Sequence, residues 1–381
     1  MSSRMRRLWL TVHRWTALSL GWVVILSGLT GAMLVVSQPL HAWWRADLFA
    51  ARTVPVADQP TAPLQPILEN LRQQFGPEAA FAFNPPKQVR DSLEVMVRAA
   101  WRGSVYFDPY TGIEQGRLGE SEGFFNALFK WHSSLWMQST GKALLAWVAL
   151  FYVALLATGL VLWWPRRWPP VLKLELHKGL LRGLFDLHRT GGALLGGIIL
   201  ISVVTGAYMA WRPLGSVFNW VADHPLETAP AQVVAPATAW PLASLDTIAA
   251  SAHRTFPDGQ VSRIQVPAGQ RGLIRVRLKM PDDPHPNGLT SVWIDPVTAD
   301  VVKQVRWNAL DPGTRATAVI YPLHTGVLGG PLLEVIVALS GLALACTGVT
   351  GLWLWWRRRS VSCAAKASAT QSVRKPPRPI V

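Results

Sequence analysis

The feature that most constrains this chain is a long apolar stretch that occurs twice. Residues 8–36 read LWLTVHRWTALSLGWVVILSGLTGAMLVV, and residues 184–211 read LFDLHRTGGALLGGIILISVVTGAYMAW. His13-Arg14 returns as His188-Arg189, and Thr30-Gly31-Ala32 returns at the same offset as Thr205-Gly206-Ala207. Each stretch exceeds the roughly 20 residues that cross a hydrocarbon core, where an ionisable side chain indicates function. The sequence therefore predicts two equivalent membrane spans, each with one functional histidine.

The composition agrees with a membrane protein. Half of the residues are hydrophobic and only 15% are charged, which excludes an ordinary soluble protein of 381 residues. Tryptophan pairs at the ends of the apolar runs, such as Trp163-Trp164 and Trp355-Trp356, are typical of membrane interfaces. We expect a mainly α-helical protein with four transmembrane helices, at residues 8–37, 143–164, 187–212 and 327–356.

The positive charge is concentrated in three segments, which are residues 1–14, 165–190 and 357–381. They hold 17 of the 37 Lys and Arg residues but only two of the 22 acidic residues. Positive charge marks the cytoplasmic face of a membrane protein, and the rest of the chain is balanced. We therefore expect a multi-pass protein with a cytoplasmic loop at 165–186, a cytoplasmic tail at 357–381 and both termini cytoplasmic. This distribution argues against nucleic acid as a partner.

Two segments, 45–120 and 213–322, have the mixed composition of small α+β domains outside the membrane. The sequence of each segment predicts a helix followed by three strands. In the first segment the helix is at 63–76 and the strands are at 79–83, 93–101 and 103–107. In the second the helix is at 242–257 and the strands are at 261–266, 273–280 and 290–294. The third strands end in the similar turns Asp108-Pro-Tyr-Thr-Gly112 and Asp295-Pro-Val-Thr298. An amphipathic helix at 121–136 leads into the second span, and the proline-rich stretch 213–241 is interpreted as a linker. The whole chain reads as an internal two-fold repeat.

Four histidines occupy matching positions in the two copies. His13 and His188 lie at the inner ends of the first and third spans, and His132 and His324 precede the second and fourth spans. A two-fold axis along the membrane normal would bring His13 to His188 and His132 to His324. Pairs of imidazoles between helices suit axial haem ligation, whereas a tetrahedral zinc site lacks further ligands. A single histidine near a span end is more often a packing residue, and the matched register favours ligation.

Other residues near these histidines have two interpretations. Arg14 and Arg189 either reach the membrane interface or pair with haem propionates. The remaining histidines have no counterpart in the other copy and are expected on the surface, with His177 the strongest exception; they are His41, His177, His224, His253 and His285.

These motifs resemble the PepSY-associated transmembrane family of bacterial iron-regulated inner-membrane proteins. The resemblance covers residues 5–360 and rests on the His-Arg and Thr-Gly motifs, on Leu323-His324, and on the two Asp-Pro turns. It implies two periplasmic PepSY-like domains and two haem b groups, bound by His13, His188, His132 and His324. It departs from the family pattern at Ala299, where the first turn has Gly112.

The resemblance further implies a FoxB-type ferrisiderophore reductase, in which electrons cross the bilayer to a ferric siderophore in the periplasm and release Fe(II). The electron donor stays open between the quinol pool and a carrier on the cytoplasmic side. The alternative is a non-enzymatic membrane anchor whose PepSY-like domains bind a periplasmic partner. A transporter is disfavoured because the spans lack charged residues at mid-depth.

Overall fold

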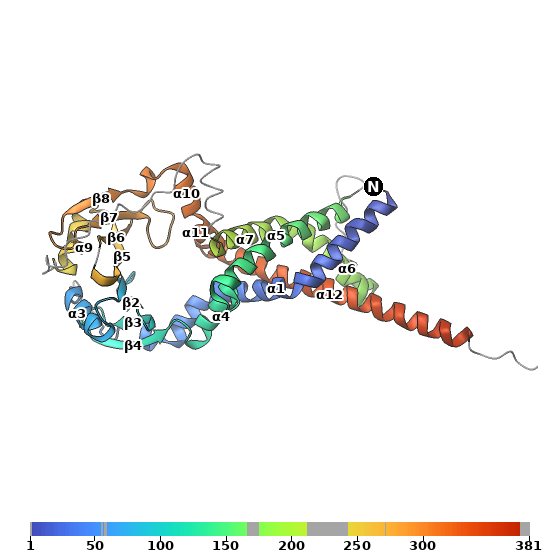
Figure 1. The fold of residues 1–381 in the computed structure, drawn as a ribbon, viewed down its shortest axis with the longest axis horizontal. Coiled ribbons are helices and arrows are strands. Elements are labelled where there is room, and N and C mark those ends of the chain that lie inside the picture. The colour runs from blue at the N-terminus through green and yellow to red at the C-terminus, as the bar shows by residue number, and fades with distance from the viewer. Residues whose placement is uncertain are drawn as a thin grey trace, which may run out of the picture. The chain divides into compact units, whose positions relative to one another are not determined.

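The computed structural model describes residues 2–54, 56, 59–165, 175–211, 243–270 and 272–373 (Figure 1). The chain divides into two compact units. The first consists of Met1–Met33, His132–Ala210 and Ile336–Val381, and the second of Leu34–Trp131 and Trp211–Val335. The proline-rich stretch 213–241, residues 166–174 of the loop 165–186 and the end of the tail lie outside the described residues.

The first unit is a helix bundle. Its principal helices are α1 (Ser3–Trp44), α5 (Gln138–Trp163), α6 (Leu180–Asp186), α7 (Gly192–Ala210) and α12 (Gly330–Val373). A π-helical turn at Leu187–Gly191 joins α6 to α7. Four segments are long and apolar enough to cross a membrane, namely Ser3–Ser37, Gln138–Trp163, Leu180–Ala210 and Val327–Ser360. The four predicted spans are therefore confirmed as candidate membrane helices.

Small residues set the approach of α1 to α12. A Cβ added at Gly28 would lie 2.6 Å from the Gly341 carbonyl oxygen, and one at Gly341 would lie 2.7 Å from the Gly28 oxygen. The backbones touch because neither position has a side chain, as is common between membrane helices. The bundle core is completed by side chains from α1, α5, α7 and α12, including Val23, Tyr152, Ile199 and Leu344.

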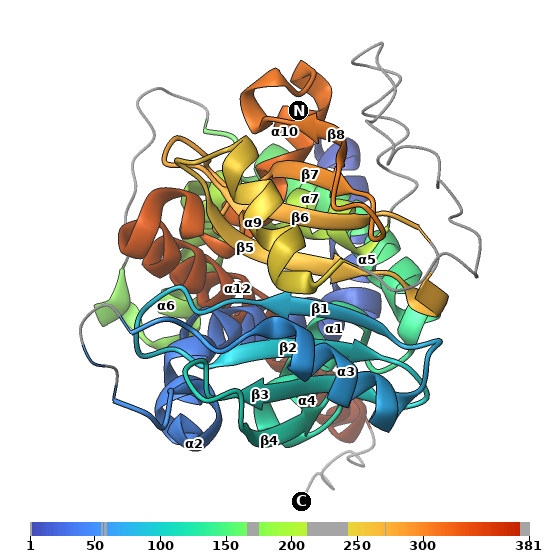
Figure 2. The same ribbon diagram turned by 90° about the vertical axis from the view of Figure 1, so that its left-hand side faces the viewer.

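The second unit contains one antiparallel sheet of eight strands (Figure 2). The first four strands are β1 (Ala80–Asn84), β2 (Leu93–Arg98), β3 (Arg102–Phe107) and β4 (Glu114–Gly119). The last four are β5 (Gln260–Val266), β6 (Ile274–Lys279), β7 (Thr290–Ile294) and β8 (Val301–Val305). Their order is β4-β3-β2-β1-β5-β6-β7-β8. From the central pair β1–β5, the strands of each half therefore follow one another in chain order toward the edge of the sheet.

The two extramembrane segments are joined at this central pair. We expected two small domains, whereas β1 and β5 pair antiparallel, with Phe81 opposite Val266 and Phe83 opposite Ile264. Pairing covers two edge strands that would otherwise expose unsatisfied backbone groups. The sequence prediction also missed β4 and β8, the outermost strands, whose mixed polar sequences lack a clear apolar alternation.

Helices α3 (Leu64–Phe75) and α9 (Leu245–Thr255) cover the same face of the sheet (Figure 2). Their apolar sides and the inward residues of the strands form the main core, which includes Leu71 and Ile248. The two helices cap each other. The Asp246 carboxylate accepts hydrogen bonds from the backbone N–H groups of Leu64 (2.8 Å) and Gln65 (3.1 Å). In return, the Gln65 side-chain oxygen accepts from the Leu245 N–H at 2.9 Å, so each helix satisfies donors of the other.

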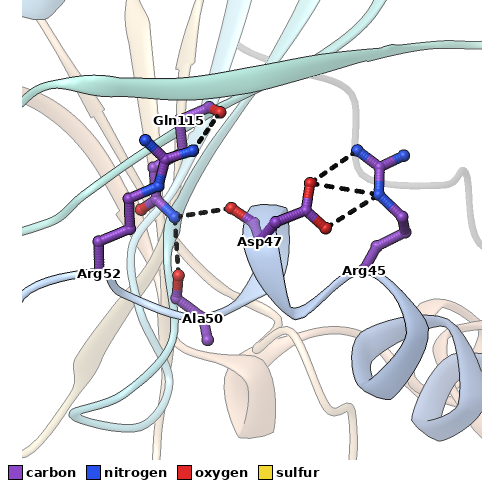
Figure 3. Close-up of polar contacts among 5 residues, drawn as sticks. All are labelled: Arg45, Asp47, Ala50, Arg52 and Gln115. Carbon is purple, nitrogen blue, oxygen red and sulfur yellow. Dashed lines mark hydrogen bonds and ion pairs between the residues drawn. The ribbon is translucent and has the colours of Figure 1, made fainter.

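A short helix, α2 (Ala46–Phe49), is held against β4 by polar contacts (Figure 3). The Gln115 side-chain amide donates to the carbonyl oxygens of Asp47 (3.1 Å) and Ala50 (2.7 Å). Arg52 donates to the Gln115 carbonyl at 2.8 Å, and Arg45 pairs with Asp47. Leu48 packs in a small buried cluster on this side. The segment after α1 is thereby fixed to the first half of the sheet.

The turns after β3 and β7 share one conformation. At Asp108 partial burial opposes ionisation, but N–H groups of Thr53, Tyr110 and Thr111 bind the carboxylate and lower its pKa. Gly112 has φ of 70°, and Ala299 takes the corresponding place with φ of 63°. The departure at Ala299 therefore leaves the turn intact, at the energetic cost of a left-handed residue with a Cβ.

Candidate functional site

His13 is held in the bundle by α5. Its Nδ1 lies 2.9 Å from the hydroxyl oxygen of Thr158. The Thr158 hydroxyl donates its own proton to the Leu155 carbonyl at 2.8 Å. The oxygen can therefore only accept from the imidazole, which places the proton on Nδ1 and leaves the Nε2 lone pair free for a ligand.

His188 is held in the same way by α12. Its Nδ1 lies 2.9 Å from the Thr347 carbonyl oxygen and 3.3 Å from the Thr350 hydroxyl. Both oxygens are acceptors, because Thr350 donates to the Cys346 carbonyl at 2.7 Å. His188 also lies in the π-helical turn Leu187–Gly191, a departure from α-helix that often occurs at functional sites.

The two imidazoles are close neighbours in the bundle. The ring centres of His13 and His188 are 6.3 Å apart, and the ring planes make an angle of 82°. Metal–imidazole bonds are about 2 Å long, so two rings on opposite sides of one ion have centres about 6 Å apart. This pair has the separation of two axial ligands. Among the described residues there is no cluster of three or more His, Cys, Asp or Glu side chains that could hold a metal.

A glycine lies beneath each ring. A Cβ added at Gly159 would lie 3.4 Å from His13 Cε1, and one at Gly351 would lie 3.0 Å from His188 Cε1. Each histidine therefore rests on a Thr-Gly pair, Thr158-Gly159 or Thr350-Gly351. We did not identify these pairs from the sequence, although they are related by the offset that relates His132 to His324.

His132 is bound to α1 by the same arrangement. It lies in α4 (Gly123–Ser134), and its Nδ1 is 3.1 Å from the Thr30 hydroxyl. Thr30 donates to the Leu26 carbonyl at 2.7 Å, and a Cβ added at Gly31 would lie 2.9 Å from His132 Cε1. The matched Thr30-Gly31 motif thus positions this histidine and places the proton of its ring on Nδ1.

A strained turn follows His132. Leu135, Trp136 and Gln138 have positive φ angles of 49°, 60° and 51°, which are uncommon for residues with a Cβ. A Cβ added at Gly141 would lie 1.7 Å from the Ser134 carbonyl oxygen, so the start of α5 requires glycine there. Such strain often accompanies functional positions.

His324 lies in α11 (Ile320–Thr325) of the second unit and is half-buried. Its pairing with His132 stays a prediction. Thr205 is the sequence counterpart of Thr30, and its hydroxyl likewise donates to a carbonyl one turn back, that of Ile201, at 2.7 Å. The hydroxyl oxygen of Thr205 is therefore prepared to accept a hydrogen bond as Thr30 does.

The remaining predicted residues have varied surroundings. Arg14 and Arg189 are exposed, which suits both of their interpretations, and His177 and His253 are exposed as expected. His41 instead packs on Phe49 and Phe125, with ring centres 4.8 Å and 4.6 Å away. His285 is half-buried and stacks on Tyr321 at 5.4 Å. Both differ from the predicted surface positions, and His224 lies outside the described residues.

These features define a membrane protein with histidines paired inside a helix bundle and an antiparallel sheet in a second unit. More particularly, the chain belongs to the PepSY-associated TM region family, whose model matches residues 10–358. No curated protein matches the chain.

Proposed function

We propose that this protein is a haem-dependent reductase of the bacterial inner membrane. It would move electrons from the cytoplasmic side or the quinol pool to a ferric siderophore in the periplasm and release Fe(II). The observation that supports this proposal is the neighbouring pair His13 and His188, whose ring centres are 6.3 Å apart, with the proton of each ring on Nδ1.

The donor set fits haem b. Histidines that bind metals usually donate the other ring N–H to an oxygen, which fixes the tautomer and orients the ring. Here the Thr158 hydroxyl oxygen and the Thr347 carbonyl oxygen accept the hydrogen bonds from these N–H groups. His13 and His188 would hold one haem, and His132 with His324 would hold the second. When bound, haem iron accepts and donates single electrons, which is the change that converts Fe(III) to Fe(II).

The chain's own contribution is to position the imidazoles and to keep water away. The apolar core that includes Val23, Tyr152 and Ile199 lies on the same helices as the histidines and gives the interior of the bundle a low polarity. The glycines allow the ring edges to lie against the helix backbones, so the side chains are restrained on two sides. Arg14 and Arg189 would pair with haem propionates.

Three architectural proposals accompany the function. The strand order, the same in both directions from the β1–β5 pair, supports an internal two-fold repeat of two PepSY-like units. The concentration of Lys and Arg supports cytoplasmic termini. The four apolar helices support contact with a lipid bilayer.

The first test is an absorption spectrum of the detergent-purified protein, oxidised and then reduced with dithionite, with haem measured per chain. We expect a strong Soret band that sharpens on reduction and about two haems per chain. A colourless protein from cells supplied with haem would contradict the proposal and favour the membrane anchor.

The second test concerns the pair itself. His13→Ala and His188→Ala should each remove the same single haem, whereas His177→Ala, an exposed histidine, should remove none. Loss of both haems from a variant that still folds would contradict the pairing. Thr158→Val, which keeps His13 but removes its acceptor, should weaken haem retention about tenfold or more.

A further inference from the structure

We infer that the open face of the sheet, opposite α3 and α9, binds an iron chelate that carries carboxylate groups and net negative charge. This inference rests on the proposed function and names its substrate class. The site is an open pocket of about 360 Å³ along the β1–β5 junction. Arg98, Arg263, Arg275 and Trp293 line it from four different strands.

Positively charged side chains are adjacent to one another beside this pocket. Arg263 on β5 and Arg277 on β6 are direct cross-strand partners, an arrangement that destabilises a sheet when both residues carry the same charge. The side-chain Nε of Arg277 is buried with no hydrogen-bond partner in the part of the chain that the structure describes. Lys87 and Lys279 extend the same positive region, because both act electrostatically on His285 together with these two arginines.

The nearby acids are already engaged. Glu94 accepts hydrogen bonds from Asn84 (3.0 Å) and Ser104 (2.6 Å). The Asp283 carboxylate accepts from two backbone N–H groups, those of His285 and Leu289. Among the described residues, Lys87, Arg263, Arg277 and Lys279 form no salt bridge. These bases donate instead to uncharged oxygens, which belong to the side chains of Asn287 and Asn84 and to the backbone of Asp283, His285 and Gly288. Their positive charge therefore has no neutralising acid among the described residues, and a bound anion would supply one.

The ionisation of the bases agrees with that interpretation. Burial, then the charges of Arg275 and Arg263, lowers the pKa of Arg277 to about 10. Burial, then Arg263, also lowers the pKa of Lys87. A bound anion would offset this repulsion and the cost of desolvation.

The geometry favours planar carboxylates and a flat ligand surface. Guanidinium groups bind carboxylates through two parallel hydrogen bonds. Arg275 lies over the Trp293 ring at 5.0 Å and donates to Ser291, so its plane is fixed. A volume of about 360 Å³ lies in the range of sites for small molecules rather than macromolecules.

The test measures binding of gallium(III) citrate, which cannot be reduced, to the full-length protein in nanodiscs of zwitterionic lipid. We expect saturable binding that weakens with added salt. Arg263→Gln and Arg277→Gln should each weaken it about tenfold, as expected for a lost charge-assisted contact. Arg98→Gln alters an exposed side chain of the pocket lining, so it should keep the fold and also weaken the binding. The matched control is Arg254→Gln on α9, on the opposite face, which should bind as the wild type does.

Several results would overturn the inference. The first is equal weakening by Arg254→Gln, and the second is unchanged binding in all three variants Arg98→Gln, Arg263→Gln and Arg277→Gln. The third is equally tight binding of a gallium trihydroxamate chelate without negative charge. A fourth result would assign the face to lipid headgroups. In that case no gallium citrate would bind, and the variants would co-purify with less anionic phospholipid than the wild type. Because gallium is redox-inert, absence of haem would overturn the proposed function and leave this binding result unaffected.

Discussion

Replacing the glycines beneath the histidine rings by alanine should change the stability of the protein in opposite directions at different positions. Replacing a helix glycine by alanine stabilises a helix by up to about 1 kcal/mol. The added methyl group also meets the imidazole Cε1, at 3.4 Å for Gly159→Ala, 3.0 Å for Gly351→Ala and 2.9 Å for Gly31→Ala. Carbon atoms prefer separations of about 3.5–4.0 Å, so the first contact is nearly ordinary and the last is compressed.

The balance of these two effects sets the magnitudes. Overpacking a tight site costs about 1–3 kcal/mol, and this cost exceeds the helix gain only where the ring cannot retreat. We expect Gly159→Ala to be stabilising by up to about 1 kcal/mol and Gly31→Ala to be destabilising by about 1–2 kcal/mol. Gly351→Ala should lie between them. In all three cases a threonine next to the glycine binds the ring Nδ1, so the ring cannot move away freely and the contact distance sets the order.

The assay is reversible unfolding in mixed micelles of a mild detergent and sodium dodecyl sulfate, followed by tryptophan fluorescence. Gly197→Ala is the control, because an added Cβ there meets no atom of the described residues within 4 Å. If Gly31→Ala were as stable as Gly159→Ala, the close packing of histidine on glycine would be refuted. Haem content is a second readout, which should fall for Gly31→Ala and be retained for Gly159→Ala.

Three further outcomes are expected in the second unit. Ala299→Gly should be stabilising by about 0.5–1 kcal/mol, because it relieves a left-handed residue at the expense of chain entropy; denaturation midpoints would check this, and a loss of stability would contradict it. Asp246→Ala should cost about 1–2 kcal/mol in the same assay, since two N–H groups of α3 lose their acceptor; an unchanged midpoint would argue against the reciprocal cap. Burial, then the charges of Arg277 and nearby bases, lowers the pKa of His285 to about 4. The unfolded chain therefore takes up a proton before the folded protein does, and stability falls as the pH drops from about 6.5 to about 4. With screening of this half-exposed group, wild type should lose about 1.5 kcal/mol relative to His285→Gln. Parallel pH profiles of the two proteins would show that His285 does not titrate in this way.

The membrane helices and the matched histidines follow from the sequence because their signals are local. A span is defined by a continuous run of apolar residues, and the cost of exposing polar backbone in lipid leaves a helix as the structure such a run can adopt. Helix α3 and the inner strands were also predicted correctly, because their buried and exposed residues repeat with the period of the element. The histidine positions were visible because the His-Arg and Thr-Gly-Ala motifs recur in the sequence at a constant offset.

Tertiary structure decided what depends on distant backbone and hydrogen bonds. The sequence does not indicate that β1 pairs with β5, since edge pairing is formed by main-chain groups that every residue possesses. Nor does it indicate that the Thr158 hydroxyl and the Thr347 carbonyl accept hydrogen bonds from the histidines, because these acceptors lie on other helices. The side chains of Arg263 and Arg277 meet only because register places them opposite each other. The apolar and alternating patterns of the sequence are enough to assign residues to the membrane helices and the inner strands, because those signals are local. Which of these residues face one another depends on packing between segments that are distant in the chain.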